Sequence, residues 1–129
     1  MGDNQSVPQG ELAICVLAMP KDTNANGDIF GGWLVSHMDM GGGIEAAHRA
    51  NCRVVTVAID GMKFIKPVYV GDIVKYYAKL VKVGHTSMQF QMEAWTQSLR
   101  DTNSKKVAEG IFTFVAIDDK GNKQLVDRS

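Results

Sequence analysis

Asp39 is the residue in this chain best suited to chemistry, because it is a carboxylate within an apolar stretch. Its neighbours are Met38 and Met40, and an unpaired charge among such side chains is costly. One interpretation is a general base or a nucleophile. The other is an acid satisfied by Ser36, by His37 or by a backbone group. The residues alone leave both interpretations open.

A glycine pair, Gly31 and Gly32, precedes this acid near the expected start of the same helix. Backbone amides at a helix N-terminus carry partial positive charge and can hold an anion or a developing oxyanion. Glycine also lets a ligand carbonyl approach the backbone, because it has no Cβ. No Gly-Lys-Ser/Thr sequence follows, so a P-loop is excluded. The pair is therefore a candidate oxyanion donor.

The segment before the glycine pair, residues 22–28, matches the first half of an EF-hand calcium loop. The twelfth position of such a loop should be a bidentate Glu, and here it is Trp33. An Asx-rich turn that leads into a helix accounts for the same residues. The two cysteines, Cys15 and Cys52, have neither zinc spacing nor a disulfide framework. We therefore expect no metal site.

The bulk composition limits the function classes. The chain has 129 residues, which predicts a single domain over residues 1–129. Lys+Arg and Asp+Glu number 14 each, so the formal net charge is zero, and non-specific nucleic-acid binding is not expected. There is no signal-peptide pattern and no apolar run of about 20 residues. We expect a cytoplasmic protein that binds neither nucleic acid nor membrane.

The apolar pattern predicts the elements that position these residues. Asp28 is the expected N-cap of a long, mostly apolar helix over about residues 28–50. Short connections between the later strands predict an antiparallel sheet curved around this helix, an α+β fold. We expect an ordered core over about residues 8–119, with a frayed N-terminus and a solvated, polar C-terminal tail. The expected strands cover residues 11–19, 53–65, 73–83, 86–99 and 107–117.

Three segments together resemble a known family. The segment MPKDTNANGDIFGGWLVSHMDMGGG is similar to the signature of YciA-type acyl-CoA thioesterases, which have the hotdog fold. RVVTVAIDGMKFIKPVYVGDIV and VKVGHTS resemble strand segments of the same family. The similarity covers about residues 7–119. Where relatives often have Gln, this chain has His37.

The resemblance implies hydrolysis of an acyl-CoA thioester to a free acid and coenzyme A, with no separate cofactor. The family's catalytic acid corresponds to Asp39, which would act as general base or as nucleophile. The loop asparagine corresponds to Asn24, which would orient the water or the thioester. The oxyanion donor corresponds to the amide of Gly31 or Gly32.

The spacing of this motif constrains assembly. Gly31 and Asp39 are 8 residues apart, which is about 12 Å along a helix. A thioester carbon needs its oxyanion donor and its base or nucleophile each within about 3 Å, so one helix cannot supply both. Two antiparallel helices of a homodimer can supply both, with Gly31 of one chain facing Asp39 of the other. Such a dimer has two composite sites. Glycines 41–43 would permit close helix contact, and the resemblance suggests a hexamer, a trimer of dimers.

The contacts with coenzyme A are predicted only from charge and from position at strand ends. The candidates are Arg53, Lys66 and the turn formed by Gly84, His85, Thr86 and Ser87.

Two other functions remain open. A hotdog hydratase or dehydratase would need a histidine paired with a carboxylate, but His37 is expected to point about 200° away from Asp39 on a helix. A non-catalytic acyl-CoA-binding module would bind the ligand without releasing thiol.

Overall fold

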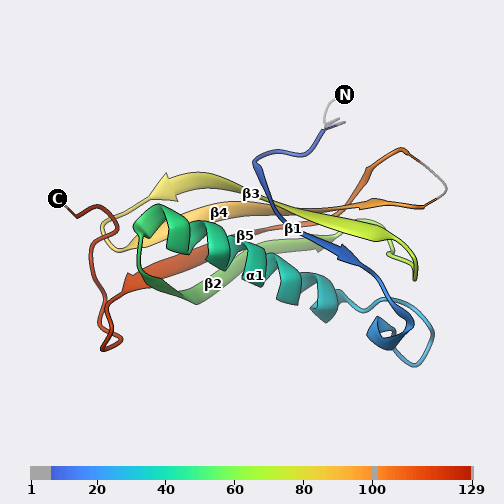
Figure 1. The fold of residues 1–129 in the computed structure, drawn as a ribbon, viewed down its shortest axis with the longest axis horizontal. Helices are drawn as coiled ribbons and strands as arrows, with labels where there is room; N and C mark the ends of the chain where they lie inside the picture. The colour runs from blue at the N-terminus through green and yellow to red at the C-terminus, as the bar shows by residue number, and fades with distance from the viewer. Residues whose placement is uncertain (1–6, 100–101, 129) are drawn as a thin grey trace.

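The computed structural model describes residues 7–99 and 102–128. One long helix lies across one face of a curved five-stranded sheet (Figure 1), whose strands run in the order β1-β3-β4-β5-β2. All neighbouring strands are antiparallel, which confirms the predicted α+β architecture. The elements are β1 (Glu11–Leu17), the 3₁₀ helix η1 (Pro20–Asp22), α1 (Gly31–Ala50), β2 (Arg53–Phe64), β3 (Ile73–Val83), β4 (Ser87–Gln97) and β5 (Lys105–Ile117).

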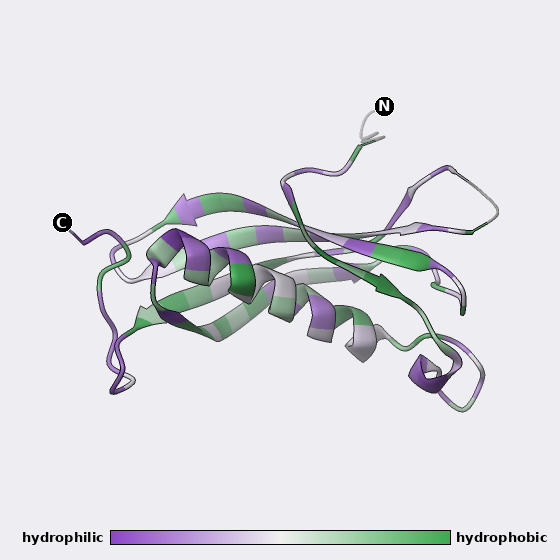
Figure 2. Ribbon diagram, viewed as in Figure 1, coloured by the Kyte–Doolittle hydropathy of each residue, from purple (hydrophilic) through white to green (hydrophobic). Residues whose placement is uncertain are grey.

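The core lies between the helix and the sheet, where strand side chains alternate between the two faces. On β4, the apolar side chains of Met88, Phe90, Met92 and Ala94 are all buried. Apolar and polar residues also alternate visibly along the ribbon (Figure 2). In the part of the chain that the structure describes, no helix is both long enough and apolar enough to span a membrane.

The helix begins three residues later than predicted. Phe30, not Asp28, is the N-cap, with extended backbone dihedral angles (φ −84°, ψ 154°). Asp28 is held in the preceding loop, because its carbonyl accepts the N–H of Asn24 at 2.8 Å. Thr23 and Ile29 also form an antiparallel bridge. Gly31 is therefore the first residue of the helix.

The helix glycines pack against the sheet of their own chain. A Cβ on Gly42 would lie 2.7 Å from the Phe114 ring, and a Cβ on Gly41 would lie 3.2 Å from Ala13. Both glycines are buried. The prediction that glycines 41–43 serve contact with another helix is therefore wrong for these two, which allow α1 to approach β1 and β5 closely.

The opposite face of the helix is open. Met40 is 52% exposed and Ile44 is 42% exposed, and residues four apart lie on the same side of a helix. The sheet therefore covers only one side of α1 within a single chain. Edge strand β1 is also partly open, with Leu12 and Leu17 about half exposed.

The C-terminal tail is largely exposed, but it is anchored to the fold through Gln124, Val126 and Asp127. The N–H of Gln124 donates to the carbonyl of Ala116 at 2.9 Å. Val126 is 3% exposed, and the Arg49 guanidinium lies 2.7 Å from the Asp127 carboxylate. This contact holds the pKa of Asp127 below its usual range. At the other terminus, residues 1–6 of the expected frayed segment lie outside the described residues, whereas the N–H of Gln9 donates to Glu93 at 3.2 Å.

Candidate active site

Asp39 is oriented by a threonine on the sheet. It is half-buried on α1, and its Oδ1 accepts the hydroxyl of Thr56 at 2.6 Å. Thr56 lies on β2, which follows the helix in the chain. The second carboxylate oxygen, Oδ2, has no hydrogen-bond partner among the described residues. Neither Ser36 nor His37 satisfies the acid, so one oxygen of Asp39 remains available to a water or a substrate.

The start of the helix presents free amide donors beside an apolar groove. The first N–H groups of a helix have no partner within it, although that of Trp33 donates to the carbonyl of Phe30 at 3.1 Å. Gly31 lines a groove of about 400 Å³ whose walls are mostly apolar. The Phe64 ring covers Gly31 closely, since a Cβ there would lie 3.0 Å from it. Gly32 is exposed, so both glycines of the pair are placed at the helix start as predicted.

Asn24 holds the loop that precedes the helix. Its side-chain oxygen accepts the N–H groups of Asn26 and Asp28, at 2.9 and 3.1 Å, which is an Asx turn. The oxygen of Asn24 is thus occupied by the loop, while its NH₂ group can still donate. Within residues 7–99 and 102–128, no three His, Cys, Asp or Glu side chains cluster as a metal site would require.

The structure keeps Gly31 and Asp39 apart within one chain. Both belong to α1, and their separation of 8 residues corresponds to about 12 Å along the axis. The amide donors of the helix start and the Asp39–Thr56 pair are therefore two separate groups on one chain, each of them a candidate half-site. The expectation that one chain does not bring them together is confirmed.

Comparison with known proteins decides the family. Residues 26–102 match the model of the thioesterase superfamily. The acyl-CoA thioester hydrolase YciA of Escherichia coli is 48% identical over 129 residues, which is 98% of each chain. The chain belongs to the YciA family of acyl-CoA thioester hydrolases.

Solved structures agree with this family and with the hotdog fold. A hexameric, broad-specificity acyl-coenzyme A thioesterase is 46% identical, with a TM-score of 0.90, over 98% of this chain and 88% of the other. An aspartate-to-alanine mutant of that enzyme has also been solved. A hexameric hotdog-fold thioesterase of Campylobacter jejuni is 37% identical, with a TM-score of 0.86, over 92% and 91% of the two chains.

A more distant structure carries information about single residues. The acyl-CoA hydrolase of Staphylococcus aureus, solved with butyryl coenzyme A, is 31% identical, with a TM-score of 0.81, over 87% of this chain and 68% of the other. Further structures of that enzyme carry alanine in place of an asparagine and of a threonine, and these two positions are 32 residues apart.

The predicted coenzyme A contacts of this YciA-family chain lie at opposite ends of the helix. Lys66 lines the same groove as Gly31. Arg53 lies beyond the C-terminal end of the helix and donates to the carbonyl of Asp119 at 3.4 Å. The turn at residues 84–87 lies at that same end (Figure 1), tied to the tail because the His85 carbonyl accepts the N–H of Val126 at 2.8 Å. Within one chain, Lys66 and the other candidates do not form one site.

His37 is engaged in the core of the YciA-family fold. Its Nδ1 lies 2.9 Å from the Trp33 carbonyl, and its ring stacks on Tyr76 with the centroids 5.4 Å apart. Burial raises the pKa of the Tyr76 phenol. These contacts leave Asp39 without a paired histidine, so they do not favour the hydratase or dehydratase alternative.

One candidate site residue, Thr56, and one residue that supports the nearby loop, Asp22, escaped the sequence analysis. Thr56 belongs to a run of β-branched residues, and no local pattern separates the threonine that meets Asp39 from its neighbours. Asp22 was noted only as part of the possible calcium loop. Its carboxylate instead accepts the N–H of Met19 at 3.0 Å and pairs with Lys21 at 3.0 Å, next to the loop that carries Asn24.

Asp22 should make the fold sensitive to acid. The Met19 N–H, and then the Lys21 side chain, lower the pKa of Asp22. A carboxyl whose folded-state pKa is depressed stabilises the fold above its ordinary pKa of about 3.9, and this contribution is lost as pH falls through the folded-state pKa. We expect Asp22→Asn to lower the urea midpoint at pH 6, and we expect its difference from the wild type to shrink progressively as pH falls below about 3.9. The control, Asp60→Asn, alters an exposed carboxylate on β2. This role of Asp22 would be contradicted if Asp60→Asn lowered the urea midpoint equally. A decrease of the midpoint in Asp22→Asn that does not change with pH would also contradict it.

Proposed function

We propose that this chain hydrolyses acyl-CoA thioesters to a free acid and coenzyme A, with Asp39 as the catalytic carboxylate. The observation that carries this proposal is the Asp39–Thr56 hydrogen bond at 2.6 Å. It fixes one carboxylate oxygen and leaves the other available for the reaction. In either role of Asp39, as general base or as nucleophile, the C–S bond breaks, the thiolate of coenzyme A leaves and is protonated, and water supplies the second oxygen of the free acid.

The second half-site comes from a partner subunit. The amide of Gly31 or Gly32 of one chain faces Asp39 of the other and stabilises the oxyanion that develops on the thioester carbonyl. The open helix face at Met40 and Ile44 supports this arrangement, because exposed apolar patches commonly mark interfaces. The relatives described as hexameric support a trimer of such dimers, each dimer with two composite sites.

Asn24 and Thr56 support the site from the loop and from β2. They are 32 residues apart in this chain, the same separation as the asparagine and the threonine replaced in the Staphylococcus enzyme. The NH₂ group of Asn24 can donate to the attacking water or to the thioester oxygen. Thr56 acts as a positioning residue for Asp39, through its hydroxyl.

Thr56→Val should lower kcat about tenfold with a smaller change in KM, because the hydroxyl that holds the Asp39 carboxylate is lost. Thr56→Ser keeps a hydroxyl and should recover most of the activity. Steady-state kinetics with a saturable acyl-CoA separates the two parameters. A change confined to KM, or a Thr56→Ser variant as impaired as Thr56→Val, would argue against positioning of Asp39.

A thiol-trapping assay over acyl chains from acetyl to palmitoyl tests the activity and its chain-length preference. Absence of thiol release from every acyl-CoA, together with tight coenzyme A binding, would instead identify a non-catalytic binding module. Single-turnover hydrolysis in heavy-oxygen water then separates the two roles of Asp39. Label in the Asp39 carboxylate indicates a mixed anhydride, and its absence there favours direct attack by water.

A further inference from the structure

Tyr76 carries a buried hydroxyl group that its surroundings leave unsatisfied. The side chain lies on β3 and is 0% exposed, and its Oη has no hydrogen-bond partner among the described residues. Such a hydroxyl is unfavourable, because burial removes its hydrogen bonds with water. Phenylalanine would fill the same space without this cost. Packing alone therefore does not account for a tyrosine at this position.

The Tyr76 hydroxyl is a hydrogen-bond donor whose neighbouring charge is a carboxylate. Burial, and then the charge of Asp22, raise the pKa of the Tyr76 phenol, so the group keeps its proton under ordinary assay conditions. A protonated phenol can donate one hydrogen bond, and a carboxylate is a strong acceptor. Asp22 is thus the acceptor available to this donor.

A row of rings connects Tyr76 with Asp22 beneath the start of α1. The Tyr76 ring stacks on His37 with the centroids 5.4 Å apart, and His37 meets Trp33 edge to face at 4.6 Å. The Met19 N–H has the largest effect on the pKa of Asp22, and the Trp33 side chain also lowers it. The carboxylate and the hydroxyl therefore belong to one cluster, which also contains the first turn of the helix.

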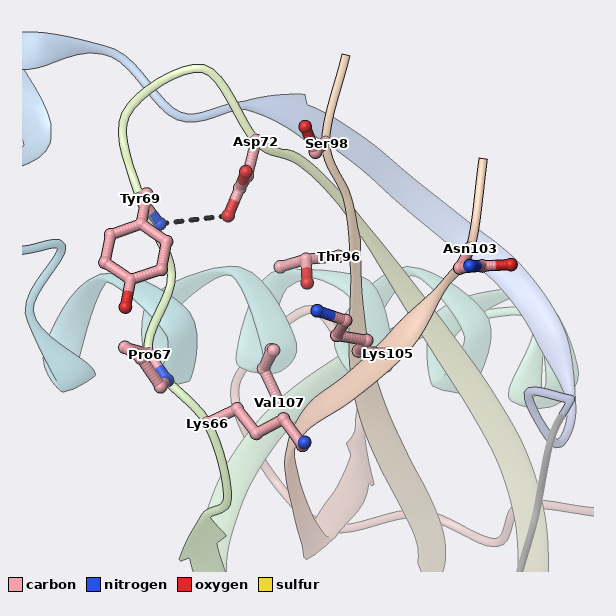
Figure 3. A pocket seen from close by; sticks show the side chains of 9 residues that line it. All are labelled: Lys66, Pro67, Tyr69, Asp72, Thr96, Ser98, Asn103, Lys105 and Val107. Carbon is pink, nitrogen blue, oxygen red and sulfur yellow. Dashed lines mark hydrogen bonds between the residues drawn. The ribbon is translucent and has the colours of Figure 1, made fainter. Parts of the chain in front are cut away.

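Asp22 ends the 3₁₀ helix η1, which leaves from a fixed base at Ala18. The N–H of Ala18 donates to the carbonyl of Asp72 at 2.9 Å, and the carbonyl of Ala18 accepts the N–H of Gly71 at 2.8 Å. The Asp72 carboxylate closes that turn by accepting the N–H of Tyr69 at 3.0 Å (Figure 3). Ala18 is therefore anchored to the turn that precedes β3.

Beyond this base, the loop of residues 19–28 is held together mainly by its own contacts. The main-chain hydrogen bonds that the structure shows for these residues all lie within the loop, such as that from Asn24 to the carbonyl of Asp28 at 2.8 Å. A segment whose hydrogen bonds are internal can shift as one unit without breaking them. Asp22 and Asn24 would then move together.

We infer that Tyr76 is a positioning residue for hydrolysis. When acyl-CoA binds, the loop of residues 19–28 shifts toward β3, and the Tyr76 hydroxyl donates a hydrogen bond to the Asp22 carboxylate. Asn24 follows Asp22 by two residues, so the same shift brings the NH₂ group of Asn24 to the thioester. This inference rests on the proposed hydrolase function and assigns a residue outside its site to it.

Tyr76→Phe removes the hydroxyl and keeps the ring. We expect kcat to fall about fivefold, because the loaded loop loses one hydrogen bond to a carboxylate. The urea midpoint of the unliganded variant should equal or exceed that of the wild type, since the resting hydroxyl has no bond to lose. The matched control is Tyr77→Phe on the opposite face of β3, which should leave both quantities unchanged. A lower midpoint with unchanged kcat in Tyr76→Phe would overturn the inference.

A double variant tests whether Tyr76 acts through Asp22. In an Asp22→Asn background the acceptor has lost its charge, so Tyr76→Phe should lower kcat by a smaller factor than it does in the wild type. An equal factor in both backgrounds would show that Tyr76 acts independently of Asp22, contrary to the inference.

Hydrogen exchange tests the shift of the loop without using activity. The Asp39→Asn protein should hold butyryl coenzyme A unhydrolysed, and binding should slow amide exchange in residues 19–28. Adding Tyr76→Phe should reduce this protection, and equal protection in both proteins would contradict the inference. If the wild-type protein releases no thiol from any acyl-CoA, the proposed hydrolysis fails, while exchange with the bound thioester still tests the loop.

Discussion

Asp39→Asn should lower kcat for acyl-CoA hydrolysis by about a thousandfold, within the range of general-base catalysis. Asparagine has nearly the same shape, and its oxygen can still accept the Thr56 hydroxyl that lies 2.6 Å from Asp39. The substitution therefore removes the charge and the proton acceptor while keeping the local packing. Thiol release at saturating acyl-CoA measures the loss.

A matched variant on the same helix controls for charge. Glu45 is a half-buried acid of α1, and Glu45→Gln should keep wild-type turnover. Circular dichroism and sedimentation should show the same fold and the same assembly for both variants. Near-normal turnover in Asp39→Asn would remove Asp39 from the catalytic role, whereas an equal loss in Glu45→Gln would indicate a general effect of charge on the helix.

Gly31→Pro should lower kcat by about a hundredfold or more, if its amide is the oxyanion donor. Proline has no N–H, yet it is well tolerated at the first position of a helix. That is the position of Gly31, and the preceding Phe30 already has the extended conformation that proline requires (φ −84°, ψ 154°). Gly31→Ala adds a Cβ at the same place near Phe64 but keeps the N–H, so it separates crowding from loss of the donor. The same pair of variants at Gly32 shows which amide is used.

Mixing the two inactive proteins then tests whether the site is shared. In a heterodimer of Asp39→Asn and Gly31→Pro chains, one composite site carries both changes and the other carries neither. Random exchange of equal amounts should restore about a quarter of wild-type activity, since half of the dimers are mixed and each has one intact site. Activity that stays at the level of the separate variants after proven exchange would show that each chain builds its own site.

The relative placement of Gly31 and Asp39 could be predicted from the sequence, because it depends only on their spacing along one helix. Gly31 and Asp39 lie on one helix as predicted, and the period of the helix separates them whatever else the chain does. The start of the helix could not be placed from Asp28, because the Asx turn at Asn24 competes for the same residues. The pattern of apolar residues does not predict local hydrogen bonds of that kind.

Thr56 and the C-terminal tail depend on contacts between distant parts of the chain. The Thr56 hydroxyl meets Asp39 because β2 pairs with β5 in one register and turns that face toward the helix. Val126 is buried because the tail returns to the carbonyl of His85. A strand pattern gives the alternation of faces but not which neighbour a face will meet, so neither contact follows from the sequence alone.

Gly42, which lies against the Phe114 ring, limits how far this protein can be stabilised by substitutions in the helix. Replacing helix glycines by alanine is a common route to a more stable protein. At Gly42 the new methyl group would meet the ring of Phe114 at 2.7 Å, and that ring is held between Phe90 and Phe112. The helix would have to lift away from the sheet, and Asp39 would move away from Thr56. Thermal tolerance and catalytic competence are thus opposed at this position, and engineering for heat resistance should begin elsewhere on the chain.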